Sequence, residues 1–407
     1  MKCRHCQSPL ENVLIDLVNQ PPSNSFLTGG QLDEPEIFYP LKVYICPKCF
    51  LVQLPEYKKS RDIFSNDYAY YSSFSSSWVE HARRYVDMAE ERFALSKDSF
   101  VLEVASNDGY LLQWFVKKGI PCLGVEPSGG TADAAFKKGV ESVREFFGAA
   151  LANKLVEQGR QADLLLGNNV LAHVPDVNDF VDGLKIALKP GGTVTMEFPY
   201  LGNLVRLGQF DTIYHEHFSY FSLFSAQRIF ASRRLVIFDV ETLPTHGGSL
   251  RIFAGHAEEN RAVLASVERI MAEEQSMGFA TMDYYRGFQE KADNVKVDML
   301  DFLVEQRKRG KLVAAYGAAA KGNTLLNYCG IRSDLIPFCV DASPHKQGLF
   351  MPGSHIPVLS PSTVRERRPD YVVILPWNLQ EEIRHQHAYI KEWGGRFVTA
   401  IPTLHIY

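Results

Sequence analysis

The chain has 407 residues, 46% of them hydrophobic, and a formal net charge of -4 at pH 7, which predicts two or three domains with sizeable cores. The slightly acidic balance argues against a general nucleic-acid binder, and no apolar run approaches the ~20 residues that a membrane span needs. Residues Met1 to Cys6 lack the apolar core of a signal peptide. We therefore expect a cytoplasmic protein that binds neither nucleic acid nor membrane, with cysteines present as thiols or metal ligands.

Four of the seven cysteines form two Cys-x-x-Cys pairs: Cys3 and Cys6, and Cys46 and Cys49. Two such pairs can supply four thiolates to one tetrahedral zinc ion. Four cysteines leave no open position for a substrate, so we expect structural Zn2+ in an N-terminal domain of residues 1–70. Two unrelated thiol pairs or a redox pair are the alternatives, and His5 is expected to be a bystander.

A stretch rich in tyrosine and serine follows at residues 68–77. It has little helical or strand periodicity, and its hydroxyl groups and ring edges could line a pocket. A capped loop leading into a helix over residues 78–92 is an equally good interpretation. The candidates for substrate binding in this stretch are Tyr68, Tyr70, Ser72 and Ser73.

Strands and helices alternate through the middle of the chain. Strands are predicted at residues 100–105, 121–126, 163–167, 193–198, 235–240 and 249–254. Helices are predicted near residues 109–118, 130–138, 148–158, 177–188 and 225–233. This alternation predicts a mainly parallel sheet with helices on both faces. No helix separates the last two strands, so we expect an antiparallel strand at the sheet edge, the plan of a small-molecule methyltransferase.

The first two of these strands carry acids where a cofactor would bind. The loop Ser106-Asn107-Asp108-Gly109 follows Glu103, and the second strand ends at Glu126, which could accept hydrogen bonds from ribose at close to the usual spacing of about 20 residues. G-x-G-x-x-G is absent, and a carboxylate would repel phosphate. The sulfonium and amino groups of S-adenosylmethionine suit this acidic loop, and a buried turn without ligand is the alternative. The cofactor-binding candidates are Glu103, Ala105, Asn107, Asp108, Gly109, Glu126, Pro127 and Asn168.

Ionisable residues cluster in Tyr214-His215-Glu216-His217, after the fourth strand of the predicted sheet. Loops after the carboxyl ends of strands flank the ligand crevice in such sheets. Histidine can take up and release a proton near neutrality, so the cluster favours acid–base chemistry. His173 follows the third strand. Metal binding that includes His173 and solvated loop histidines are the alternatives.

The last part of the chain predicts helices and then a second α/β unit. Two apolar stripes are expected to be packing faces; they comprise Val263, Leu264, Val267, Ile270 and Met271, and Val295, Met299, Phe302 and Leu303. A strand over residues 312–317, a helix and a strand ending at Asp341 then form a small Rossmann-like unit. Gly317 and Gly322 imitate a Walker loop, but Asn323 stands where its lysine should be, which argues against ATP hydrolysis.

These motifs together resemble the sugar-nucleotide C-methyltransferases of deoxysugar biosynthesis, of the 3-C-methyltransferase type acting on ketosugars linked to thymidine diphosphate. The resemblance covers nearly the whole chain. It is carried by the two cysteine pairs and by residues 106–109, 168–173, 214–217, 246–249, 317–328 and 341–353. Two departures are Ala319, where the family often has proline, and Phe218, where it often has tyrosine.

The resemblance implies an α/β fold whose core is a Rossmann-like class I S-adenosylmethionine methyltransferase. It implies a zinc-binding domain at residues 1–70 and a cofactor-binding domain at 71–256. A helical connector at 257–310 then leads to a Rossmann-like domain at 311–407 that holds the sugar nucleotide. In the implied reaction, a base removes the proton beside a ketone and the enolate takes the methyl group of the cofactor. A dry, preorganised pocket would speed such a step.

The resemblance also implies roles for individual residues. His217 is the base, and Tyr214 shares or relays the proton. Glu216 anchors hydroxyl or amino groups of the sugar. His173 and Asn169 form hydrogen bonds with the substrate or the developing enolate oxygen.

Three residues of the last domain, Lys321, Asn323 and Lys346, are expected near the diphosphate, although a surface role is the commoner explanation for each lysine alone. The partner is then a small-molecule nucleotide sugar, and we expect a monomer or a weak oligomer. The alternatives are O- or N-methylation of another small molecule, a nicotinamide-dependent sugar-nucleotide oxidoreductase, and a zinc-ribbon nucleic-acid module.

Overall fold

A computed structural model describes residues 1–63 and 70–407. The chain divides into two compact units, each assembled from three segments. The first unit contains Met1–Asn12, Ile45–Tyr200 and His217–Tyr284. The second contains Val13–Tyr44, Leu201–Glu216 and Tyr285–Tyr407. The domain boundaries proposed from the sequence stay predictions.

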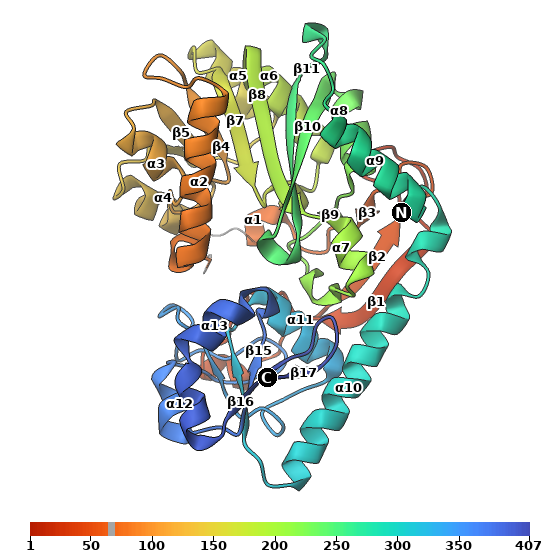
Figure 1. Cartoon of the computed structure of the whole chain (residues 1–407), viewed down its shortest axis with the longest axis vertical. Helices are drawn as coiled ribbons and strands as arrows, with labels where there is room; N and C mark the ends of the chain where they lie inside the picture. The colour runs from red at the N-terminus through yellow and green to blue at the C-terminus, as the bar shows by residue number, and fades with distance from the viewer. Residues whose placement is uncertain (64–69) are drawn as a thin grey trace. The chain divides into compact units, whose positions relative to one another are not determined.

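The first unit is built on a seven-stranded sheet in the order β10-β11-β8-β7-β4-β5-β6 (Figure 1). Its strands are β4 (Val101–Val104), β5 (Cys122–Val125), β6 (Ser142–Val143), β7 (Ala162–Asn168), β8 (Leu188–Pro199), β10 (Leu235–Leu243) and β11 (Ser249–His256). Strands β8, β7, β4, β5 and β6 are parallel, as the alternation predicts. The predicted antiparallel hairpin of the last two strands is confirmed, but the strand that runs against the others lies one place in from the sheet edge. Strand β11 is antiparallel to both β8 and β10 and lies between them. The second strand of the hairpin therefore pairs with β8, and the first strand, β10, is left at the edge of the sheet.

The first unit also contains α-helices, most of which flank this sheet (Figure 1). They are α1 (Ser60–Ile63), α2 (Ser76–Arg92), α3 (Leu112–Lys117), α4 (Gly129–Phe136), α5 (Ala149–Glu157), α6 (Val177–Ala187), α8 (Leu223–Ser232) and α9 (Ala265–Met277). Ser75 caps α2 by accepting a hydrogen bond from the backbone of Trp78, as serine at this position commonly does. The buried face of α2, which includes Tyr85, packs with Phe115 of α3 and Leu164 of β7 in one apolar core.

Strand β3 (Val52–Gln53) pairs antiparallel with β9 (Ser219–Tyr220) in the same unit. The predicted apolar stripe from Val263 to Met271, which overlaps the start of α9, was partly wrong. Val263 and Leu264 precede the helix and are 42% and 45% exposed, whereas Val267 and Ile270 inside it are buried. Periodicity misplaced the first two because the helix begins only at Ala265.

The second unit contains a six-stranded sheet in the order β14-β13-β12-β15-β16-β17, parallel except for β17. Its strands are β12 (Val313–Tyr316), β13 (Cys339–Val340), β14 (Val358–Leu359), β15 (Tyr371–Ile374), β16 (Arg396–Thr399) and β17 (His405–Ile406). Most of β1 (Asn12–Gln20) and β2 (Tyr39–Ile45) also belongs to this unit. Its helices are α7 (Leu201–Arg206), α10 (Phe288–Lys308), α11 (Ala320–Cys329), α12 (Ser362–Arg367) and α13 (Gln380–Gln386).

The predicted Rossmann-like arrangement of the second unit is confirmed by the parallel pairing of β12 with β13 and β15. The apolar stripe of α10, from Val295 to Leu303, is buried as predicted. Across residues 1–63 and 70–407, no helix has both the length and the apolar composition required to cross a bilayer.

Candidate functional site

The four paired cysteines converge in the first unit. Their sulfur atoms all lie within 4.8 Å of one another. Sγ of Cys3 lies 3.6 Å from Sγ of Cys49, and Sγ of Cys6 lies 3.4 Å from Sγ of Cys46. A tetrahedral zinc ion with bonds of about 2.3 Å needs sulfurs about 3.8 Å apart, so the four residues fit the ion. Four thiolates fill its coordination sphere, which makes the ion structural.

Each cysteine pair forms a tight turn that ends in a left-handed residue. Gln7 has φ 60° and Phe50 has φ 56°, and each directly follows the second cysteine of its pair. The backbone N–H of each donates to the carbonyl of the first cysteine at 3.0 Å, Gln7 to Cys3 and Phe50 to Cys46. Neither position is glycine, so the sequence carries no local signal for this turn, and the cost of about 1 kcal/mol per residue is offset by the converging ligands.

In the cofactor-binding region, Glu126 at the tip of β5 holds the loop that follows β4. Its Oε2 accepts the N–H of Asn107 at 3.0 Å, and its Oε1 accepts the N–H of Ser128 at 2.9 Å. Burial raises the pKa of Glu126, and the two amide donors partly offset this. A carboxylate has about four acceptor sites, so Glu126 retains the capacity to bind ribose hydroxyls.

Glu103 on β4 is fully buried, and neither of its carboxylate oxygens has a hydrogen-bond partner in the described part of the chain. Burial raises its pKa well above the ordinary value, Asp108 and Glu126 raise it further, and the Tyr110 hydroxyl lowers it. A buried acid with so little hydrogen-bond support is costly. The amino group of S-adenosylmethionine would supply a donor, so these residues fit that cofactor.

The loop after β4 has an unusual backbone. Ala105, Asn107 and Gly109 have φ of 57°, 49° and 73°. A Cβ added at Gly109 would lie 3.2 Å from Cα of Ala135, so the glycine also lets the loop pack closely on α4. The side chain of Asp108 is held by Lys138, whose Nζ lies 3.1 Å from Oδ2.

The tyrosine- and serine-rich stretch lies against this same loop. Asn107 accepts the N–H of Ser72 at 2.9 Å and donates to the carbonyl of Tyr70 at 3.1 Å. The N–H of Ser73 donates to Asp108 at 3.3 Å. Of the four substrate-binding residues predicted in this stretch, the structure brings three beside the cofactor candidates, and Tyr68 lies outside the described residues.

The two predicted catalytic histidines, His173 and His217, lie together in the first unit. The ring of His217 packs edge-to-face on the ring of His173, with centroids 4.7 Å apart and an interplanar angle of 71°. The N–H of Phe218 donates to the carbonyl of Ala172 at 2.7 Å and fixes the two segments side by side. His217 is 8% exposed. The sequence placed these histidines after different strands, and the fold pairs them.

Two asparagines stand at the carboxyl end of β7, Asn168 as the last residue of the strand and Asn169 directly after it. The N–H of Asn169 donates to the carbonyl of Glu197 at 2.7 Å, and its Nδ2 lies 2.9 Å from Nε2 of His246. Nδ2 of Asn168 and Oδ1 of Asn169 are buried without a partner among the residues described. Buried polar atoms of this kind call for a partner, and a bound ligand can supply it.

A buried charge network beside these asparagines was missed by sequence reasoning. Oε2 of Glu197 lies 2.9 Å from His81 and 2.7 Å from Arg251, and Thr245 donates to Oε1 at 2.8 Å. Burial alone would raise the pKa of Glu197, but His81 and Arg251 outweigh it and lower the pKa to about 2. The only signals in the sequence were the charged residues Glu197 and Arg251 on the apolar strands β8 and β11 and His81 on helix α2. Nothing in the residues around them indicates that the three side chains meet.

The remaining residues of the predicted catalytic cluster, Tyr214 and Glu216, belong to the second unit. Nδ2 of Asn24 donates to Oε1 of Glu216 at 2.6 Å. Upstream, Trp377 donates its indole N–H to Asp211 at 2.7 Å. Burial outweighs the opposing effects of Lys321 and Trp377 and raises the pKa of Asp211 to about 6. The segment that carries Tyr214 and Glu216 is thus anchored by residues of the second unit.

The three residues predicted near a diphosphate make contacts within the second unit. Nζ of Lys321 donates to Asn378 at 2.7 Å, and its pKa is lowered by burial. Nδ2 of buried Asn323 contacts the carbonyl of Ser23 at 3.4 Å. Nζ of Lys346 donates to the carbonyl of Ala318 at 2.8 Å. A diphosphate would have to compete with these contacts.

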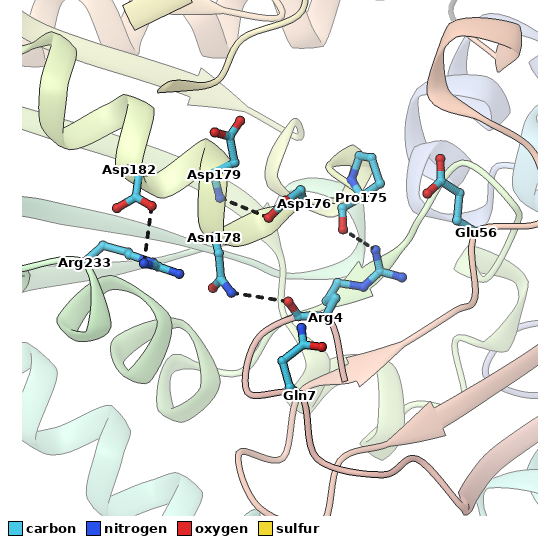
Figure 2. Close-up of a pocket in the computed structure, with 9 residues that line it drawn as sticks. All are labelled: Arg4, Gln7, Glu56, Pro175, Asp176, Asn178, Asp179, Asp182 and Arg233. Carbon is cyan, nitrogen blue, oxygen red and sulfur yellow. Dashed lines mark hydrogen bonds and ion pairs between the residues drawn. The ribbon is translucent and has the colours of Figure 1, made fainter. Parts of the chain in front are cut away.

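A polar hollow of about 630 Å³ lies between the first cysteine turn and α6, and Figure 2 draws the residues that line it. Its lining residues are Arg4, Gln7, Glu56, Pro175, Asp176, Asn178, Asp179, Asp182 and Arg233. None of them is a predicted cofactor or substrate residue. Several pair with one another, such as Asp182 with Arg233 at 3.3 Å, so we assign the hollow to the packing of the cysteine turn on α6.

Comparisons with known proteins agree with this arrangement. Family models match the chain over residues 3–64 ("Putative zinc binding domain"), 78–237 ("Methyltransferase domain") and 244–402 ("C-methyltransferase C-terminal domain"). C-methyltransferase NovU of Streptomyces niveus is 37% identical over 401 residues, which cover 98% of this chain and 95% of NovU. The chain belongs to the C-methyltransferase family. It is an S-adenosylmethionine-dependent C-methyltransferase, and the predicted fold class, cofactor and zinc site are confirmed.

Two solved structures resemble part of this C-methyltransferase. An S-adenosylmethionine-dependent methyltransferase from Clostridium acetobutylicum ATCC 824 aligns with 44% of this chain and 92% of its own, at 12% identity and a TM-score of 0.36. Magnesium protoporphyrin IX methyltransferase (ChlM) from Synechocystis PCC 6803 with bound SAM aligns with 44% of this chain and 80% of its own, at 14% identity and a TM-score of 0.33.

Proposed function

We propose that this C-methyltransferase acts on a ketosugar linked to a nucleotide, with thymidine diphosphate as the favoured nucleotide, and methylates the carbon next to the ketone. The 37% identity to a C-methyltransferase over nearly the whole chain supports transfer to carbon. The second Rossmann-like sheet and the cationic Lys321 and Lys346 support a phosphorylated substrate.

The histidine pair is the observation that carries this proposal. A carbon beside a ketone becomes a nucleophile only after it loses a proton, so the site needs a base. His217 is buried to all but 8% and packs on the edge of His173 at 4.7 Å. In the proposed mechanism His217 removes the proton. His173 and Asn169 donate hydrogen bonds to the enolate oxygen that forms, which stabilises its negative charge.

The remaining roles complete the proposal. Tyr214 shares or relays the proton, and Glu216 anchors hydroxyl or amino groups of the sugar. Bound S-adenosylmethionine supplies an electrophilic methyl group. The loop after β4, held by Glu126, orients that cofactor, and the buried setting of His217 limits the access of water. In the second unit, Lys321, Asn323 and Lys346 bind the diphosphate.

A labelling experiment tests the substrate class. The purified protein is incubated with S-adenosylmethionine carrying a 13C-methyl group and a panel of nucleotide-linked ketosugars, and the product is examined by NMR. We expect the label on a carbon adjacent to the ketone, with thymidine diphosphate sugars turned over fastest. A label bound to oxygen or nitrogen would overturn the enolate mechanism, and a wholly unlabelled panel would overturn the substrate class.

A solvent-exchange experiment tests the base separately from methyl transfer. With S-adenosylhomocysteine in place of the methyl donor, the native enzyme in D2O should exchange the proton beside the ketone for deuterium. His217→Asn should slow this exchange by about 10²–10⁴-fold. The matched control is His256→Asn, because His256 hydrogen-bonds the carbonyl of Leu188 at the opposite end of the sheet. Equal exchange rates in native enzyme and His217→Asn would remove His217 from the role of base.

A further inference from the structure

Arg4, inside the first cysteine pair, reaches away from the zinc ligands. Its Nη1 donates to the carbonyl of Pro175 at 2.8 Å, and its Nη2 donates to the carbonyl of Leu54 (Figure 2 draws the first of these bonds). Its backbone N–H donates to Oε1 of Gln53 at 2.9 Å, and Nε2 of Gln53 lies 3.2 Å from Sγ of Cys3. One residue thus links the zinc site to two other segments.

Those two segments carry the histidine pair. Pro175 lies two positions after His173 in the sequence. Leu54 is bound to the other histidine segment, because its N–H donates to the carbonyl of Phe218 at 3.0 Å. The guanidinium carbon of Arg4 also lies 5.5 Å from the ring centroid of Phe218, within the range of a cation–π contact.

The pairing of short strands extends this connection. Val52 and Gln53 of β3 pair with Tyr220 and Ser219 of β9, directly after the histidine segment. The N–H of Phe218 in turn donates to the carbonyl of Ala172 at 2.7 Å. The hydrogen bonds therefore form a closed circuit from Arg4 through both histidine segments and back to Arg4.

We propose that Arg4 is a positioning residue that fixes the distance between His173 and His217, so that the zinc site serves as the anchor of the catalytic pair. The inference rests on the proposed role of His217. The planar guanidinium fork can hold two carbonyls at once in a fixed geometry, whereas a lysine ammonium is a flexible point charge. A displacement of about 1 Å in a catalytic group can lower a rate by about 100-fold.

The test compares Arg4→Lys with Arg228→Lys. Arg228 is a matched control, because its Nη1 donates to the carbonyl of Lys48 in the second cysteine pair at 2.8 Å and its guanidinium carbon lies 4.1 Å from the ring centroid of Phe224. Arg228 is exposed and holds the zinc site through one backbone carbonyl, and among the described residues its hydrogen bond goes to the second cysteine pair and not to the histidine segments. Both proteins are assayed for bound zinc, for titrated S-adenosylmethionine sites, and for turnover per titrated site.

We expect Arg4→Lys to keep one zinc ion and normal cofactor binding, and to lose about 10- to 100-fold in turnover per site. In NMR spectra of histidine-labelled protein, the ring-proton resonances of His173 and His217, assigned with His173→Asn and His217→Asn, should move. Their edge-to-face contact produces a ring-current shift that depends on their separation. Arg228→Lys should leave both the turnover and these resonances unchanged.

Three outcomes would overturn the proposal. The first is that Arg4→Lys leaves the histidine resonances unmoved. The second is that Arg4→Lys loses its zinc, which would make Arg4 a support of the metal alone. The third is that Arg228→Lys produces the same shifts. The resonances require no sugar substrate. A failure of this inference can therefore be told apart from a failure of the proposed substrate class.

Discussion

Replacing Glu197 with glutamine should destabilise the first unit strongly. Glu197 is fully buried and accepts hydrogen bonds from His81, Arg251 and Thr245. Arg251 is itself only 5% exposed. The variant keeps the shape of the side chain but removes its charge, and it leaves the guanidinium of Arg251 buried beside a neutral amide.

The structure gives the size of this effect in two ways. A carboxylate with a pKa of about 2 in the folded chain, against an ordinary value of 4.5, contributes about 3 kcal/mol to the free energy of unfolding at pH 7. Breaking a buried ion pair by removing one partner typically costs about 3–5 kcal/mol. Both arguments lead us to expect a loss of about 3 kcal/mol in Glu197→Gln.

The sign of the pH dependence follows from the lowered pKa. The stabilisation is fully present above the unfolded pKa of about 4.5 and is lost as the pH falls toward the folded pKa of about 2. The difference between native protein and Glu197→Gln should therefore shrink as the pH falls through this range. Urea unfolding followed by tryptophan fluorescence measures it, because Trp78 stacks on His81 with ring centroids 4.9 Å apart.

Glu80→Gln is the matched control for this experiment. Glu80 also has its pKa lowered to about 2, by Arg83 and Arg84, but it lies on the exposed side of α2. Solvent-exposed ion pairs contribute little to stability, so Glu80→Gln should unfold at the same urea concentration as the native protein. A loss below about 1 kcal/mol in Glu197→Gln, or an equal loss in both variants, would refute the argument from burial.

Two further predictions concern the bound groups. Removal of zinc with a chelator should lower the melting temperature of the first unit in calorimetry, because the four cysteines join residues 3–6 to residues 46–49 through the metal. Added zinc should restore the melting temperature. An unchanged melting temperature in the metal-free protein would contradict a structural role for zinc. Glu126→Gln should weaken S-adenosylmethionine binding by about 10- to 100-fold in titration calorimetry, because hydrogen bonds to a charged acceptor contribute about 1.5–3 kcal/mol. Glu141→Gln, which changes an exposed acid paired with Arg160, is its control, and equal affinities would exclude Glu126 from the cofactor site.

The alternation of elements in both α/β units could be predicted because each element leaves a local signal. Buried strands such as β7 are short apolar runs, and α10 shows an apolar stripe that the structure buries. The prediction was wrong where periodicity continued past an element, at Val263 and Leu264, and where the place of β11 depended on strand pairing across the sheet. Periodicity reports the burial of a residue and says little about the neighbour that covers it.

In the candidate site, too, residues with a local signal in the sequence could be predicted, and contacts between distant segments could not. The zinc ligands could be found because Cys-x-x-Cys spacing is itself a property of a metal-binding turn. The acids could be found because Glu103 lies within the apolar strand β4 and Glu126 directly follows β5. The meeting of His81 with Glu197 and Arg251 could not be found, because each contributes only a common charged residue to its own element. The same holds for Arg4, whose bonds to Leu54 and Pro175 leave no trace in the residues around it.

By itself the sequence determined which chemical groups the protein carries and at which strand ends and turns they stand, since spacing and periodicity are local properties of a chain. Only the tertiary structure decided which of those groups meet. It brought His173 against His217 and tied both to the zinc site. The physical reason is that contacts between distant segments depend on how whole elements pack, and no short stretch of sequence encodes that packing alone.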